Sequence, residues 1–232
     1  PRTHRSSYGT SEGLAAGFEA AEVRRLLARY DEAIEAYGDV LRQALDMPVY
    51  SNPWLPFAAL RDRSELAFQD FFDRGDFERA IRMANALSPL LSMERALELQ
   101  AQSHGAEARK IQLELDEATF ADATRLEESQ AAWRRAAALY EELSVQRFAT
   151  RQYPDLLWKS AQGYLIGHDY GRAARLLRAY LHNQVRRFHP PALTALGKAN
   201  LASGLLEKAI EPLMECIEFF PRDPHVRSDE HT

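Results

Sequence analysis

The sequence predicts an all-α fold, and three observations support this prediction. Apolar residues recur at i, i+3, i+4 and i+7 along most of the chain, which is the spacing of a helix with one apolar face. Stretches in which apolar and polar residues alternate, as in half-buried strands, do not occur in the sequence. Turn-forming residues fall between the helical windows at short intervals, so we expect about ten or eleven helices joined as antiparallel neighbours.

The turn signals divide the chain in order. From the N-terminus they occur at Pro48 to Pro56, Gly75–Asp76, Ser88–Pro89, Ser103–Gly105, Pro154, Gly167–Asp169, Pro190–Pro191, Ser203–Gly204 and Pro221. Residues 106–147 contain neither Gly nor Pro, which predicts long helices there. Because residues 1–10 and 222–232 are polar, we predict a flexible N-terminal segment, a single helical domain over 11–221 and a flexible C-terminal tail.

Composition and charge narrow the classes of partner. The 232 residues are 46% hydrophobic and 27% charged, which suits one large helical domain. The net charge of −5 gives no general attraction to phosphate, so no nucleic-acid partner is predicted. No apolar run is long enough to cross a bilayer, so no membrane insertion is predicted either. The single Cys216 and the start at Pro1 leave both a cytoplasmic and an exported location open.

The most informative segment is 190–221, which predicts two helices joined at Ser203–Gly204. Its apolar pattern is Leu193-x2-Leu196-Gly197-x2-Asn200, then Ala209-x3-Leu213, then Pro221. The pattern resembles the tetratricopeptide repeat (TPR), whose spacing is W-x2-L-G-x2-Y, then A-x3-F, then P. In such a unit the small residues, here Gly197 and Ala209, let the two helices cross closely.

Two earlier segments resemble the same repeat. In 154–187, Ala161 holds the small position of the first helix, and Ala173 lies 36 residues before Ala209. In 61–90, the run from Gly75 to Ile81 matches the turn and the second helix, but Phe68 stands where a small residue is expected. One extra turn residue would instead bring Leu66 and Ala67 into that position. Similar alanines at Ala33 and Ala136 extend the series with irregular spacing, so the middle of the chain departs from the repeat.

The resemblance implies a right-handed α–α superhelix, a TPR-like solenoid of antiparallel helix pairs that binds a protein or peptide in a concave groove. The alternative is a helical bundle without true repeats. The predicted groove residues are Trp158, Gln162, Leu165, Thr194, Lys198 and Leu201. Members that clamp a C-terminal carboxylate use several Lys and Asn side chains, whereas this set offers Lys198 alone, which argues against that subclass. Trp158 has a second interpretation, as a residue packed between helices.

No catalytic motif is found, so a non-enzymatic protein without catalytic residues, cofactor or metal is predicted. His182 and His189 straddle a predicted helix end, and Cys216 lies among apolar residues as a buried thiol would. Two alternatives stay open: a structural subunit that docks through its ends or convex face, and an all-helical enzyme without a local motif. After Pro221 the sequence is too polar to cover a stripe that includes Met214, Ile217 and part of Phe219 or Phe220. We therefore expect a second copy, a partner or further repeats of a longer protein to cover this end.

Overall fold

The computed structural model describes residues 10–117, 123–185 and 189–221. Within these residues the chain is all-α, with ten α-helices, one short 3-10 helix and no strand, as the sequence predicts. Two compact units, Pro1–Glu107 and Ala108–Thr232, follow one another along the chain. The single domain over 11–221 stays a prediction. The predicted flexible ends lie outside the described residues except for Thr10, whose hydroxyl caps the first helix at 3.1 Å from the amide of Gly13.

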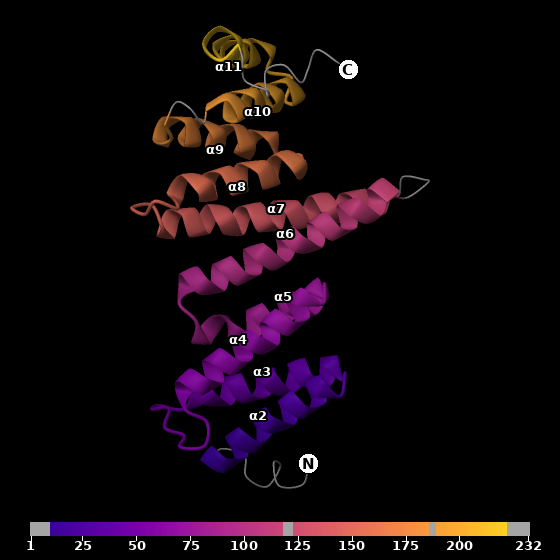
Figure 1. The fold of residues 1–232 in the computed structure, drawn as a ribbon, viewed down its shortest axis with the longest axis vertical. Helices are drawn as coiled ribbons and strands as arrows, with labels where there is room; N and C mark the ends of the chain where they lie inside the picture. Colours follow the sequence, from indigo (N-terminus) through magenta and orange to yellow (C-terminus); the bar gives the residue numbers. More distant parts are fainter. Residues whose placement is uncertain (1–9, 118–122, 186–188, 222–232) are drawn as a thin grey trace. The chain divides into compact units, whose positions relative to one another are not determined.

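The first unit contains two helix hairpins (Figure 1). They are formed by α2 (Ser11–Leu26) with α3 (Tyr30–Asp46) and by α4 (Phe57–Asp73) with α5 (Phe77–Leu87), followed by η1 (Ser88–Leu90). Their apolar faces share one core, which includes the fully buried rings of Phe18, Tyr37 and Phe71. The rings of Phe18 and Tyr37 meet edge to face with their centres 5.5 Å apart, a favourable aromatic geometry that joins α2 to α3.

The second unit is a stack of helices that follow each other in sequence. Its members are α7 (Ala123–Gln146), α8 (Tyr153–Ile166), α9 (Tyr170–Asn183), α10 (His189–Ala202) and α11 (Leu206–Phe219). Successive helices lie side by side in Figure 1, and each packs mainly on its sequence neighbours. The prediction of long helices in 106–147 is confirmed, since α6 (Met93–Glu117) has 25 residues and α7 has 24.

The predicted turn at Ser103–Gly105 is wrong, because α6 continues through it. The Ser103 hydroxyl donates a hydrogen bond of 2.8 Å to the carbonyl of Leu99, one helical turn earlier. Ser103 is fully buried, so this bond satisfies its polar group inside the helix. A serine that favours a turn when it is solvated is thus accommodated by tertiary burial, which outweighs its local preference.

Four hairpins of the described chain close with the same turn: α2–α3, α4–α5, α8–α9 and α10–α11. In each, one residue has a positive φ, which is 58° at Ala28, 70° at Gly75, 60° at His168 and 73° at Gly204. The amide of that residue donates to the carbonyl three residues back, and the next amide donates to the carbonyl five residues back. This is the Schellman arrangement. Because the second helix begins two residues after the positive φ in all four, positions in different hairpins are compared by their distance from it.

The predicted series of crossing alanines is buried at every position. Five residues after the positive φ stand Ala33, Ala80, Ala173 and Ala209, each no more than 1% exposed. Ala136 is buried to the same degree, but it lies inside α7, away from any of these turns. The common distance from the turn shows that the alanines mark one position of a repeated hairpin in four of the five cases.

The close crossing predicted at Gly197 is confirmed. A Cβ on this residue would lie 2.5 Å from both Cγ and Cδ2 of Leu213, well inside van der Waals contact. Gly197 comes seven residues before the positive φ and Leu213 nine residues after it. In α8–α9 the same two positions hold Ala161, which is fully buried, and Leu177, which is also fully buried. A small residue on the first helix therefore matches a large one on the second.

The hairpin α4–α5 exchanges the two sizes. By distance from Gly75, Phe68 takes the position of Gly197, and Ala84 takes that of Leu213. Phe68 is 2% exposed and Ala84 is fully buried. The alternative with one extra turn residue, which placed Ala67 in the small position, is wrong because this turn has the same length as the others. In this hairpin the large side chain is on the first helix, α4, and the small one is on the second helix, α5. The volume between the helices is therefore filled mainly from the first helix instead of the second.

An internal proline explains a departure from the TPR-like pattern. Pro212 lies inside α11 and has no amide hydrogen, so the carbonyl of Lys208 lacks its helical donor. The side-chain Nδ2 of Asn200 donates to this carbonyl at 2.8 Å. Asn200 stands where the repeat has Tyr and is 1% exposed. The Asn200 amide therefore replaces the donor that Pro212 lacks, which a helix without this proline does not need.

Candidate protein-binding surfaces

The six residues predicted to bind a partner lie on α8 and α10 at equivalent distances from the turns. They pair as Trp158 with Thr194, Gln162 with Lys198, and Leu165 with Leu201. Gln162, Lys198 and Leu201 are exposed, whereas Trp158, Leu165 and Thr194 are half-buried. α8 packs mainly on α7 and α9, and α10 on α9 and α11, so the two sets are connected through α9 rather than by direct packing. We call these six residues the first-helix face.

Two of the half-buried residues also stabilise the fold. The indole of Trp158 packs on the ring of Tyr180 in α9 with the ring centres 5.4 Å apart. The Thr194 hydroxyl donates to the carbonyl of Pro190 at 3.0 Å, within α10. Trp158 thus lies partly between helices, as its second interpretation states. The exposed members of the first-helix face are the ones that solvent, or a partner, reaches without displacing core contacts.

The α11 helix carries a second surface. The apolar residues from Leu206 to Ile217 do not all lie on one buried face of α11. Ala209 and Cys216 are buried, and the Cys216 thiol lies 3.6 Å from the carbonyl of Pro190, as expected of a core cysteine. Leu206, Ile210, Met214 and Ile217 are each between 55% and 63% exposed. We call these four residues the α11 strip. The exposure predicted for Met214 and Ile217 is confirmed, and Leu206 and Ile210 enlarge the surface.

A cavity of about 490 Å³ opens among α9, α10 and α11. Leu193 and Leu196 line its apolar part, and Arg178 and Glu211 are among its charged residues. Asn200 lines it as well, and its Oδ1 is buried without a hydrogen-bond partner in the described residues. At 100° per residue, Leu193, Leu196 and Asn200 are on a different side of α10 from Thr194, Lys198 and Leu201. The cavity is therefore separate from the first-helix face.

The loop between α3 and α4 presents an aromatic side chain that sequence reasoning missed. Trp54 is 71% exposed and Val49 is 80% exposed. Asn52 fixes this loop: its Oδ1 accepts from the amides of Trp54 and Leu55 at 3.0 and 3.1 Å, and its Nδ2 donates to the carbonyl of Ser11 at 2.8 Å. The Asn-Pro-Trp sequence between prolines was the available signal, since Asn commonly bonds to its own turn.

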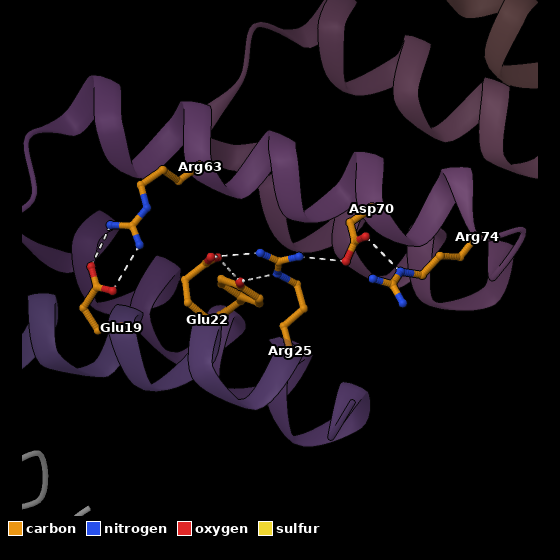
Figure 2. Close-up of polar contacts among 7 residues, drawn as sticks. Glu19, Glu22, Arg25, Arg63, Asp70 and Arg74 are labelled. Atoms are coloured by element: carbon orange, nitrogen blue, oxygen red, sulfur yellow. Dashed lines mark hydrogen bonds and ion pairs between the residues drawn. The ribbon is translucent and has the colours of Figure 1, made fainter. Parts of the chain in front are cut away.

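A network of charged groups joins the first three helices of the first unit (Figure 2). Arg25 of α2 donates to Asp70 of α4 at 2.7 Å, to Glu22 at 3.0 Å and to the hydroxyl of Tyr37 in α3 at 3.3 Å. Tyr37 in turn donates to Glu22. Asp70 also accepts from Arg74 at 2.8 Å. Each charge faces an opposite charge, so we interpret this cluster as structural.

The pKa shifts in this network follow from the same contacts. Burial, together with the hydrogen bond to Glu22, raises the pKa of Tyr37. Burial opposes ionisation of Asp70, but the bonds from Arg74 and Arg25 outweigh it and lower the pKa of this carboxyl. The paired hydrogen bonds from Arg63 lower the pKa of Glu19. These directions keep the carboxylates charged and the phenol protonated, which is a stable set of ion pairs rather than a proton-transfer site.

Three further observations concern two arginines of α9, metal binding and membranes. Arg172 contacts Asp169 and the hydroxyl of Tyr164, and Arg175 pairs with Glu141 at 2.6 Å. The described residues contain no group of three or more His, Cys, Asp or Glu side chains arranged to hold a metal ion. Among the helices of the described chain, none is both long enough and apolar enough to span a membrane.

In comparisons with known proteins, no family model matches this chain, and no curated protein is significantly similar to it.

Proposed function

We propose that this protein is a non-enzymatic scaffold that binds a peptide or a partner protein through a TPR-like solenoid of antiparallel helix pairs. The observation that carries the proposal is the repeated hairpin: four turns share one hydrogen-bond pattern, and the crossing alanines stand at one distance from each. A repeated hairpin that packs mainly on its sequence neighbours leaves long stretches of its helices exposed to partners. The right-handed superhelical arrangement belongs to the same proposal.

Within this proposal the partner contacts the first-helix face. Its exposed members combine an amide, a cation and an aliphatic group at Gln162, Lys198 and Leu201, a mixture that suits a peptide with both polar and apolar side chains. Trp158 and Leu165 form the half-buried base beneath them, and Thr194 completes the set. Truncating Trp158 removes its contact with Tyr180 as well, so it changes folding and binding together. The exposed residues are therefore the better probes.

Site-specific crosslinking tests the proposal. A photoreactive amino acid is placed at Gln162 or Lys198, and in a matched control at Arg135, an exposed residue of α7 outside the first-helix face. Crosslinks to the same partner from Gln162 and Lys198 but not from Arg135 are expected. The charge reversal Lys198→Glu is expected to weaken capture of that partner by about tenfold. Equal crosslinking from all three positions contradicts the assignment of this face.

A second candidate function is a structural subunit that docks through one end of the stack. The α11 strip favours it, because four apolar side chains on adjacent turns are more than half exposed. Both candidates are binding functions, and they differ in the surface used.

A further inference from the structure

Three of the four positions of the α11 strip correspond to buried or half-buried residues of α9, which are Tyr170, Ala174 and Leu181, whereas Met214 corresponds to the exposed Arg178. By distance from the turn, Ile210 corresponds to Ala174 of α9, and Ile217 corresponds to Leu181. Ala174 is 6% exposed and Leu181 is half-buried, whereas Ile210 is 60% exposed and Ile217 is 55% exposed. α9 packs on both α8 and α10, but in the described chain α11 packs mainly on α10 alone. The α11 strip therefore stands where the equivalent helix has a second helical neighbour.

The helix that covers α9 shows what kind of surface fits such a strip. Ala192, Ala195 and Ala199 of α10 belong to the same apolar cluster as Ala174 and Leu177 of α9. Their spacing of i, i+3 and i+7 places small side chains along one side of a helix, which allows close helix packing. A helix seated on α11 meets larger residues than α10 does, so small apolar residues on the incoming helix complement them.

Charge defines one edge of the α11 strip. At 100° per residue, Glu207, Glu211 and Glu218 are next to the strip on the side away from the buried face of α11, and all three are exposed. The one basic residue of the helix, Lys208, lies beyond this acidic edge. An incoming helix with Lys or Arg along the matching edge is attracted, and one with carboxylates there is repelled.

This chemistry argues against two occupants: a second copy packed antiparallel, and the sequence from Arg222 to Thr232. If a second copy packed strip to strip in the antiparallel sense, the two acidic edges would lie on the same side and face each other. The sequence from Arg222 to Thr232 has Val226 as its one aliphatic residue, too few to form an apolar helix face. A separate polypeptide with a basic edge meets both requirements.

We propose that the α11 strip docks an amphipathic helix of a partner protein, which presents small apolar residues at i, i+3 and i+7 and a row of Lys or Arg along one edge. The inference rests on the proposed scaffold function and names the chemistry of one partner. It uses a surface other than the first-helix face, so the two assignments fail independently.

Peptide titration against the full chain tests this inference. Two fluorescein-labelled helical peptides of about 18 residues carry the same face of Ala and Leu, with Lys along one edge in the first and Glu in the second. The Lys peptide is expected to bind, more tightly at low salt, and at least about tenfold more tightly than the Glu peptide. The double substitution Ile210→Ser with Met214→Ser is expected to weaken binding of the Lys peptide by at least about tenfold.

A control protein locates the site. Val145→Ser removes an apolar side chain of 67% exposure from α7, outside both the α11 strip and the first-helix face, and is expected to bind the Lys peptide as the unchanged protein does. The proposal is overturned if the Lys peptide does not bind, if both peptides bind equally, or if the double substitution has no effect. A dimer in sedimentation that the double substitution abolishes would show that a second copy is the occupant, which also overturns it.

Discussion

The contact between Gly197 and Leu213 gives a quantitative test of the hairpin register. Replacing Gly197 by Ala has two opposed effects on the free energy of unfolding. Ala is favoured over Gly inside a helix by about 1 kcal/mol. The new Cβ, however, would lie 2.5 Å from Leu213 Cγ and Cδ2, so the helices or the Leu side chain must shift, and such overpacking costs about 1–3 kcal/mol. We expect a net loss of up to about 2 kcal/mol.

The same substitution should change sign when Leu213 is shortened. In a Leu213→Ala background the atoms that clash with the new Cβ are gone, and the helix preference of Ala remains. Gly197→Ala is then expected to stabilise by about 1 kcal/mol relative to Leu213→Ala alone. The coupling between the two sites is therefore the overpacking cost itself, about 1–3 kcal/mol. Gly197→Leu should be destabilising beside Leu213, and part of this loss should be recovered in the Leu213→Ala background, because a large first-helix residue is matched by Ala at Phe68 and Ala84.

Urea denaturation followed by circular dichroism measures these differences. Gly38→Ala is the matched control, since Gly38 is also inside a helix but its added Cβ meets nothing closer than the Arg42 guanidinium at 3.4 Å. This control should stabilise by about 0.5–1 kcal/mol. If Gly197→Ala has the same effect with Leu or Ala at position 213, the two residues do not meet and the register is refuted.

Three further predictions concern the first unit and the turns. Gly75 and His168 both have a positive φ, a conformation that a side chain disfavours. Gly75→Ala should therefore destabilise by about 1 kcal/mol, and His168→Gly should stabilise by a similar amount. Thermal melts should show a lower melting temperature for the first variant and a higher one for the second. Phe68→Ala should cost about 3–5 kcal/mol, and adding Ala84→Leu should recover part of this loss, whereas no recovery would show that the two positions do not face each other. Hydrogen bonds from Arg79 and then Arg82 lower the pKa of Asp31 from 3.8 to about 2. The contribution of these ion pairs to the free energy of unfolding is therefore complete above about pH 4 and is lost as the pH falls toward 2. In Asp31→Asn, the free energy of unfolding should fall less steeply over this pH range.

Much of the fold follows from local sequence. The helices were predictable because apolar residues repeat with the helical period, and the crossing alanines because a buried small residue recurs after a turn sequence such as Gly75–Asp76 or Ser203–Gly204. The turns at Ala28 and His168 have no glycine at the position of positive φ, so the sequence gives no signal for this conformation. They nevertheless adopt the same geometry as the other two turns. There the length of the connection between two apolar faces, rather than the turn residue, decides the conformation.

Other features depend on partners distant in sequence. The exchange of sizes at Phe68 and Ala84 is visible only when both helices are aligned on the turn. The helix continues through Ser103 because that serine is buried, which no local preference reveals. The first-helix face stays a prediction as a binding surface, and whether Trp158 faces solvent or Tyr180 depends on how α8 and α9 cross. The exposure of Ile210 likewise depends on what lies beside α11.

The sequence-neighbour packing of α7 to α11 also determines how this unit opens. A helix inside the stack is held on two sides, whereas α11 is held mainly by α10, so local opening needs the fewest contacts broken at α11. Amide hydrogen exchange should then be fastest in α11 and slow progressively toward α8, and Pro212 removes one of the bonds that protects the end helix. A molecule that seats on α11 gives this helix a second neighbour. Its binding would be detected as slower exchange in α11 and α10, with no change expected in the first unit.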